Sequence, residues 1–305
     1  MHPIIRSALD AAPATPPYHQ LTVAELRASA KRAAPPRPDL GIQGLHDLRI
    51  PSPRGEIPVR VYVPLGAGPH PVLMYFHGGG FVLLDLDSHD YLCLRLCNWA
   101  ACVVVSVDYR LAPEHRFPAA PDDCLAATRW AAQHASEFEA DGARLAVAGT
   151  SAGGNLAAVT ALRARHEGGP PLRAQLLFYP VTDHPSKPPP SYQRYASGFG
   201  LDAEHMAWFW QQYLPDAALA SHPHASPLRA GSLVGLPPAW LAVGECDVLR
   251  DESLAYAARL RQAGVPTLAW ECPGLNHSFL KWAGVLPEVD RRLREACDWL
   301  RARFA

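Results

Sequence analysis

Lysine is scarce in this chain of 305 residues, which has only Lys31, Lys187 and Lys281. Arginine carries the remaining positive charge, and the formal net charge is −1. Because the sequence has no basic patch, we do not expect it to bind nucleic acid, and because it has no acidic tail, we do not expect a charged partner.

Long apolar runs and paired cysteines are also absent. No apolar run reaches the ~18 residues that a membrane-spanning helix requires, so no membrane span is predicted. The stretch from Met1 to Arg6 lacks the basic segment and apolar core of a secretory signal. The seven cysteines are odd in number, scattered and never arranged as CxxC. We therefore expect free thiols in a cytoplasmic protein, with no metal site.

What the chain does have is a regular alternation of buried strands and helices. Hydrophobic residues make up 49% of it, enough for one large core. A hairpin is predicted at 45–51 and 57–64. Further strands are predicted at 72–76, 102–107, 145–148, 172–179, 239–243 and 267–271, and helices at 88–100, 118–134, 251–263 and 287–303. This order predicts an α/β fold with a mostly parallel central sheet flanked by helices.

Two segments break the alternation and are interpreted as parts of a helical cap. Residues 1–45 are rich in Ala, Pro and Arg, and Thr22 with Glu25 has the pattern of a capped helix start. Residues 183–222 contain a proline-rich linker and an aromatic helix at 204–213. The predicted organisation is a cap arm (1–45), a first core part (46–182), a cap insertion (183–222) and a second core part (223–305).

Gly149-Thr150-Ser151-Ala152-Gly153 has the form Gly-x-Ser-x-Gly between a predicted strand and a predicted helix. This is the setting of a nucleophile elbow, a tight turn that exposes a serine hydroxyl at the start of a helix. Glycines suit the turn because side chains at 149 and 153 would collide with the neighbouring strand and helix. The alternative is a small-residue turn without catalytic meaning.

A serine nucleophile needs a base and an acid that orients the base. In doubly wound hydrolases these follow in the chain order Ser, acid, His, each after a strand end. Asp247 and His277 meet both conditions, and we predict them as the acid and the base. Asp251 and Asp183 remain alternative acids, and a lone loop histidine can also be structural.

His77-Gly78-Gly79-Gly80 follows the strand at 72–76. Glycines allow a close approach of the backbone and leave N–H groups free for an oxyanion. We predict an oxyanion hole made by the N–H groups of Gly78, Gly79 and Ala152, with His77 supporting the loop. A phosphate-binding loop fits less well, because neither GxGxxG nor a following GK[ST] is present.

Together these motifs resemble those of the hormone-sensitive lipase family of α/β-hydrolase esterases. The resemblance covers roughly residues 45–300 and rests on 77–81, 108–118, 149–155, 247–252 and 274–279, in that order. It implies an α/β-hydrolase core under a cap, and implies that Glu114 lies in a motif that steadies the neighbourhood of the site. Thr150, Val248 and Ser278 depart from common family residues, but none of these departures removes a catalytic group.

The predicted function is a serine carboxylesterase that acts on short- to medium-chain acyl esters through an acyl-enzyme, without metal or cofactor. Phe81, Trp208 and Phe209 could line an acyl pocket or could merely pack the cap onto the core. An amide, carbamate or lactone hydrolase with the same triad is an alternative, and a non-catalytic receptor on the same fold is a weaker one. A thiol enzyme using Cys246 is disfavoured, because no strand, turn and helix surround it. The partner is a small ester, and the sequence is compatible with a homodimer.

Overall fold

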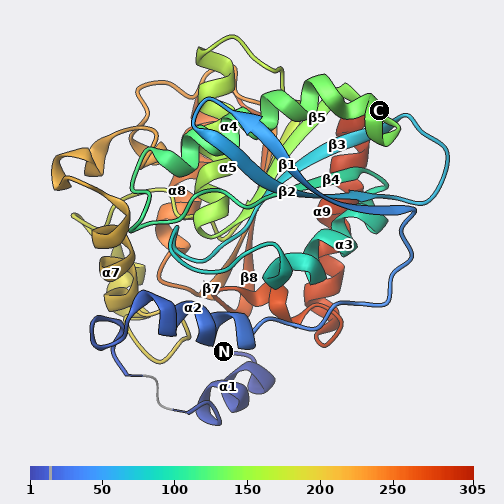
Figure 1. The fold of residues 1–305 in the computed structure, drawn as a ribbon. Helices are drawn as coiled ribbons and strands as arrows, with labels where there is room; N and C mark the ends of the chain where they lie inside the picture. The colour runs from blue at the N-terminus through green and yellow to red at the C-terminus, as the bar shows by residue number, and fades with distance from the viewer. Residues whose placement is uncertain (14–15) are drawn as a thin grey trace.

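The computed structural model describes residues 1–13 and 16–305. Eight strands form one sheet in the order β1-β2-β4-β3-β5-β6-β7-β8 (Figure 1). The strands are β1 (Gly44–Ser52), β2 (Gly55–Val63), β3 (His70–Phe76), β4 (Val103–Val107), β5 (Ala140–Thr150), β6 (Ala174–Phe178), β7 (Ala239–Cys246) and β8 (Thr267–Asn276). The predicted α/β fold and mostly parallel sheet are confirmed.

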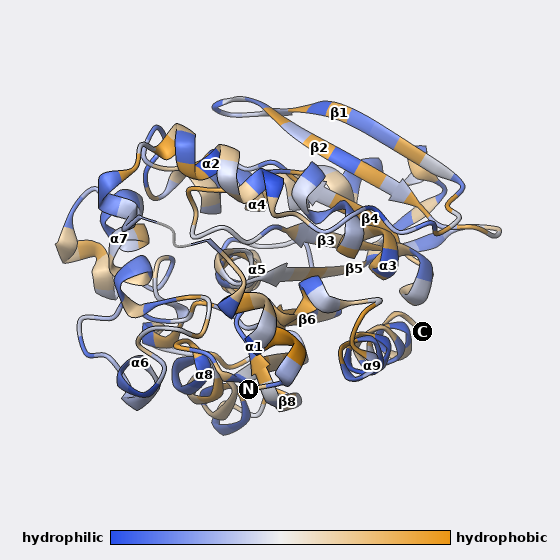
Figure 2. Cartoon of the chain, turned by 90° about the horizontal axis from the view of Figure 1, so that it is seen from below, coloured by the Kyte–Doolittle hydropathy of each residue, from blue (hydrophilic) through white to orange (hydrophobic). Residues whose placement is uncertain are grey.

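Within the described residues, only β2 runs antiparallel to the other strands of the sheet. β1 and β2 form the predicted antiparallel hairpin, in which Ile50 lies opposite Ile57, and β2 pairs antiparallel with β4. All pairs from β4 to β8 are parallel. The central strands β3, β4 and β6 are buried along their whole length, as expected where helices cover both faces. β1 and β8 are the two edge strands, both partly exposed, and hydrophilic residues run along β1 in Figure 2.

Five long helices cover the sheet. α3 (Asp90–Ala100) packs with α9 (Pro287–Phe304) on one face (Figure 2). α4 (Ala119–His134) packs with α5 (Ala152–His166) on the other face, where α8 (Arg250–Gln262) also lies. The core between these layers includes the buried side chains of Tyr75, Phe178 and Trp240.

Four helices stand outside this sandwich: α1 (Pro3–Asp10), α2 (Val23–Arg32), α6 (Pro190–Arg194) and α7 (Ala203–Tyr213). In Figure 1, α1, α2 and α7 gather at one end of the molecule, beside β7 and β8. The predicted start of α2 is confirmed, because Thr22 and Glu25 form a capping box. Helix α1 was not predicted; it buries Ile5, and the residue before it, His2, donates its N–H to the Gly274 carbonyl at 2.7 Å.

All seven cysteines are buried free thiols. Across residues 1–13 and 16–305, no helix combines the length and the apolar character needed to cross a bilayer. Within the same residues, no group of three or more His, Cys, Asp or Glu side chains is arranged to hold a metal ion.

Candidate active site

Ser151 lies at the turn between β5 and α5, with φ 55° and ψ −119°. A non-glycine residue rarely adopts this conformation, so the surrounding structure must hold it in place. The Ser151 N–H donates to the Phe178 carbonyl at 2.9 Å, and the Ser151 carbonyl accepts the Val181 N–H at 3.2 Å. The end of β6 therefore fixes the elbow from one side.

The two glycines of the elbow are required by close backbone contacts. A Cβ atom at Gly149 would lie 2.1 Å from the Gly153 carbonyl oxygen, and one at Gly153 would lie 1.9 Å from the Phe76 carbonyl oxygen. Real Cβ atoms essentially never approach so closely. The turn can therefore pass against β3 only with glycine at 153, as predicted on steric grounds.

Three strand ends bring Ser151, His277 and Asp247 together. Ser151 Oγ lies 2.9 Å from His277 Nε2, and His277 Nδ1 lies 2.8 Å from Asp247 Oδ2. The other carboxylate oxygen of Asp247 accepts the Leu249 N–H at 2.9 Å. Tyr179 packs against the His277 ring with a centroid separation of 4.9 Å. The three residues are nearly buried, with exposed fractions of 7%, 8% and 1% for Ser151, His277 and Asp247.

The two alternative acids are engaged elsewhere. Asp251 accepts the Ser191 N–H at 2.8 Å and pairs with its neighbour Arg250. Asp183 forms an ion pair with Arg229, with a nitrogen–oxygen distance of 2.7 Å. Of the three carboxylates considered from the sequence, the structure places Asp247 against His277.

The glycine loop after β3 borders the same site, but Gly78 does not match its predicted role. Its N–H donates to the ring nitrogen Nε2 of His89 at 3.3 Å, so it is not free for an oxyanion. Among the described residues, the N–H groups of Gly79 and Gly80 contact no acceptor. Ala152 is the first residue of α5, where the backbone N–H has no intrahelical partner.

His77 is fully buried at the start of this loop. Its Nδ1–H donates to the Gly78 carbonyl at 2.7 Å, and its ring stacks on Tyr109 with a centroid separation of 4.3 Å. Tyr109 in turn donates its hydroxyl to the His77 carbonyl at 2.8 Å. Burial lowers the pKa of His77 to about 4, so the ring is neutral near pH 7.

Glu114 lies outside the catalytic constellation. It is half exposed and forms a two-pronged ion pair with Arg27 of α2, with distances of 2.9 and 2.7 Å. Arg27 also donates to the carbonyls of Val82 and Ala112 at 2.9 and 3.0 Å. Glu114 therefore helps to attach α2 to the segment between β4 and α4, while the Arg27–Val82 bond joins α2 to the loop that follows the glycines.

A cavity of about 340 Å³ opens over Ser151 and His277. The N-terminal helices and α7 both contribute to its wall, which is largely apolar. Lining residues from these two segments include Leu9, Tyr18, Ala30, Met206 and Phe209.

Two of the three predicted pocket residues lie elsewhere. Phe81 is 2% exposed and stacks on Tyr213 at 3.8 Å, so it belongs to the packing under α7. Trp208 borders a separate hollow next to Tyr18. Phe209 does line the cavity. Adjacent residues on a helix point about 100° apart, and of the neighbours 208 and 209 it is Phe209 that faces the cavity.

The basic side chains of His89 and Lys281 also line the cavity, and neither was predicted from the sequence. Among the described residues, no carboxylate lines the cavity, and Lys281 forms no ion pair. Burial lowers the pKa of Lys281. Nothing in the spacing of either residue marks it, because each lies in a short 3-10 helix, at Asp87–His89 and Phe279–Trp282.

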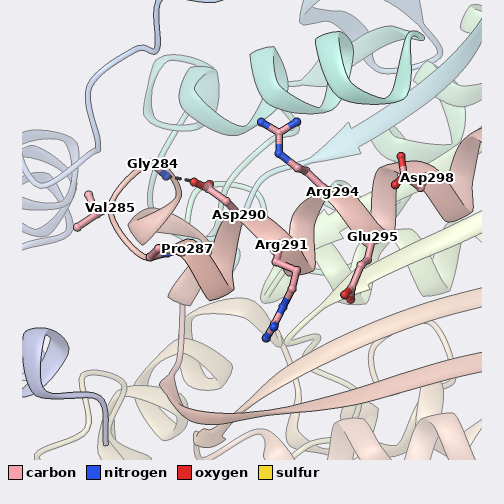
Figure 3. Close-up of a pocket in the computed structure, with 8 residues that line it drawn as sticks. All are labelled: Gly284, Val285, Pro287, Asp290, Arg291, Arg294, Glu295 and Asp298. Carbon is pink, nitrogen blue, oxygen red and sulfur yellow. Dashed lines mark hydrogen bonds between the residues drawn. The ribbon is translucent and has the colours of Figure 1, made fainter.

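A second hollow lies at the start of α9 (Figure 3). Its volume is about 530 Å³, and its walls are mostly charged side chains of α9 such as Asp290, Arg291 and Glu295. The Gly284 N–H donates to Asp290 at 2.9 Å, which closes the turn before the helix. The hollow contains no member of the Ser151–His277–Asp247 group, and its composition is that of a solvated helix face.

Comparisons with known proteins show the fold and the family of this chain. A family model described as alpha/beta hydrolase fold matches residues 73–281. The carboxylic ester hydrolase LipN of Mycobacterium tuberculosis is 47% identical over 81% of this chain and 67% of that protein. The ethyl acetate hydrolase of Pseudomonas putida is 42% identical over 82% of this chain and 80% of that protein.

Solved structures of esterases superimpose closely on this chain. An esterase of Pyrobaculum calidifontis superimposes with a TM-score of 0.93 at 37% identity, covering 99% of this chain and 98% of that one. A thermostable esterase from Pseudomonas putida superimposes with a TM-score of 0.94 at 39% identity, covering 99% and 97%. The chain belongs to the hormone-sensitive lipase family of α/β-hydrolase esterases, which its motifs resemble.

Proposed function

We propose that this carboxylic ester hydrolase acts on short- to medium-chain acyl esters, with Ser151 as nucleophile, His277 as base and Asp247 as orienting acid. The observation that carries the proposal is the continuous contact from Ser151 Oγ through the His277 ring to Asp247, at 2.9 and 2.8 Å. The ester hydrolase class follows from the relatives, which are named as ester hydrolases and esterases.

The hydrogen bonds assign the protons in the resting site. An ionised Asp247 can only accept, so His277 carries its proton on Nδ1 and presents an unprotonated Nε2 to the Ser151 hydroxyl. Ser151 Oγ attacks the ester carbonyl carbon while Nε2 takes the hydroxyl proton, and Asp247 stabilises the resulting imidazolium. His277 then gives this proton to the leaving alcohol. Water repeats the sequence on the acyl-enzyme and releases the acid.

We assign the oxyanion hole to the N–H groups of Gly79, Gly80 and Ala152. This revises the sequence-based set by replacing Gly78, whose N–H already has an acceptor in His89. All three glycines of the loop line the cavity, so the change moves the donors by one residue along the same wall. Each such donor typically contributes ~3 kcal/mol to lowering the barrier.

The cavity supports the assignment of substrate size. Its volume of about 340 Å³ accommodates a small acyl group, and its apolar wall suits a hydrocarbon chain. We propose that residues 1–45 and 183–222 form a cap over the core (46–182 and 223–305), since both segments supply lining residues such as Leu9 and Phe209. Such a cap favours small dissolved esters.

The test is hydrolysis of p-nitrophenyl esters from acetyl to palmitoyl by the wild type and by folded Ser151→Ala, His277→Ala and Asp247→Asn variants. We expect activity on the shorter esters, and a loss of roughly 10³-fold or more in kcat for each variant. Asp251→Asn is the matched control for Asp247→Asn and should retain most of the activity.

Two outcomes would redirect the proposal. An inactive wild type whose Ser151 is still labelled by an organophosphate would retain the triad and move the substrate to amides, carbamates or lactones. An inactive wild type without labelling would refute catalysis and favour a receptor.

A further inference from the structure

His89 lies outside the triad yet contacts both sides of the site. It precedes α3, is 6% exposed, and has no role in the steps described above. Its Nε2 accepts the Gly78 N–H at 3.3 Å and lies 3.4 Å from Thr150 Oγ1, while its Nδ1 lies 3.1 Å from Ser88 Oγ. One ring therefore joins the glycine loop, the nucleophile elbow and the turn before α3.

The contacts admit a single arrangement of protons. A backbone N–H can only donate, so Nε2 of His89 is unprotonated and the ring proton is on Nδ1. Thr150 then donates its hydroxyl to Nε2 and accepts from the Tyr75 hydroxyl at 3.1 Å. On the other side, Ser88 Oγ accepts from Nδ1–H and donates to the Asp85 carbonyl at 2.6 Å. Every polar hydrogen in this series of contacts, from Tyr75 to Ser88, has an acceptor.

These contacts place His89 between the two halves of the proposed oxyanion hole. Gly78 immediately precedes Gly79 in the loop, and Thr150 is two residues before Ala152 in the elbow. A ring that bonds to both fixes the separation between the donors. A misplaced donor is costly, because the hole works only when its N–H groups are held where the oxyanion forms.

We propose that His89 is a positioning residue for the oxyanion hole, acting as a neutral ring that accepts the Gly78 N–H through Nε2. This rests on the proposed function, because it assumes that the neighbouring N–H groups bind an oxyanion. His89 touches the loop and the elbow and transfers no proton.

The same chain of contacts reaches the N-terminal arm. Asp85, which anchors Ser88 through the Ser88 N–H at 3.0 Å, forms an ion pair with Lys31 of α2 at 2.9 Å. α2 is therefore bonded to the turn that carries His89. Lys31→Met should therefore lower kcat in the same direction as loss of the His89 ring, but by much less, since exposed ion pairs contribute little.

The variants are His89→Gln, whose side-chain oxygen can accept near the position of Nε2, and His89→Leu, which cannot accept. His70→Leu is the matched control. His70 is a buried histidine at the start of β3, at the end away from the glycine loop, and its Nε2 lies 3.3 Å from the Gly66 carbonyl oxygen. Thermal unfolding establishes that each variant is folded before kinetics on p-nitrophenyl butyrate are measured.

We expect His89→Leu to lower kcat by roughly 10²-fold with little change in KM, and His89→Gln to recover most of the loss. Ki for a trifluoromethyl ketone, whose adduct places an oxyanion in the hole, should rise in proportion to the fall in kcat/KM. Wild-type kcat in folded His89→Leu, or a rise in KM alone, would overturn the proposal, as would a failure of Gln to rescue.

One measurement does not depend on activity. In ¹⁵N-histidine spectra, His89 should show a protonated Nδ1 and an unprotonated Nε2, and the Gly78 amide should exchange with solvent faster in His89→Leu than in the wild type. An inactive wild type with these signatures would refute the proposed function while leaving the Gly78 contact established. The opposite tautomer would overturn the positioning role.

Discussion

Because His89 is buried, we predict that the free energy of unfolding depends on pH in a specific way. Desolvation, reinforced by the nearby His77 ring, lowers the pKa of His89 from 6.5 to about 3. Above pH 6.5 the ring is neutral in both the folded and the unfolded chain, so pH has no effect through it. Below pH 6.5 the unfolded chain binds a proton that the folded chain does not, and the free energy of unfolding falls as the pH falls.

The size of the effect follows from the shift. Each pH unit between the two pKa values costs ~1.4 kcal/mol, so His89 should remove about 2 kcal/mol of stability between pH 7.5 and pH 5. The wild type alone will not show this cleanly, because other groups change in the same range. Burial raises the pKa of Glu252 to about 8 and that of Asp108 to about 6, which opposes the histidine effect. Burial of His77, with a pKa of about 4, adds to it.

Comparing the wild type with His89→Gln isolates the contribution of His89 to the pH dependence of the unfolding free energy, since Gln does not titrate. Urea unfolding of both proteins at pH 7.5, 6 and 5, followed by tryptophan fluorescence, gives the stability difference at each pH. We expect the wild type to lose about 2 kcal/mol relative to the variant between pH 7.5 and 5. The groups that surround the ring are Tyr75, Tyr91, His77 and the Asp85 turn. A difference constant within ~0.5 kcal/mol would show that folded His89 titrates normally, and would refute the reasoning.

Three further predictions concern the elbow and the cavity. Gly153→Ala should abolish soluble expression or activity, because its Cβ would meet the Phe76 carbonyl at 1.9 Å; a folded, fully active variant would contradict the steric argument. Phe209→Leu should shift the preferred p-nitrophenyl ester toward longer chains, whereas Trp208→Leu, outside the cavity, should leave the chain-length profile unchanged. Lys281→Met should lower kcat/KM for a carboxylate-bearing ester about twofold to fivefold relative to a neutral one, as expected for a partly screened charge. The exposed Lys187→Met is its control, and equal effects of the two variants would assign the change to net charge.

The elbow could be predicted because its geometry is local. Five consecutive residues define the turn, and the collisions that exclude side chains at Gly149 and Gly153 involve the strand and helix on either side. Asp247 and His277 were predictable for a related reason. Both follow strands of a parallel sheet, and the carboxyl ends of such strands meet at one edge.

The role of His89 and the engagement of Gly78 could not be predicted. Their contact joins two residues that are eleven positions apart in the sequence, the path between them depends on the turn at Gly79, and no spacing rule encodes it. The prediction that Phe81 and Trp208 line the pocket was wrong for a different reason. An aromatic cluster shows that a helix packs against something, but not which of its faces the cavity occupies. Trp208 and Phe209 are chemically alike, and only the tertiary structure separates them.

The seven buried thiols can be used to detect local opening of the fold. Burial raises the pKa of Cys97 to about 12 and that of Cys272 to about 11, so neither forms the reactive thiolate near neutral pH. Because the cysteines are distributed from α3 to α9, no single local opening exposes them all. A disulfide-exchange reagent added to the native enzyme will therefore react stepwise as separate regions open. The order in which the cysteines are modified will show which part of the fold opens first.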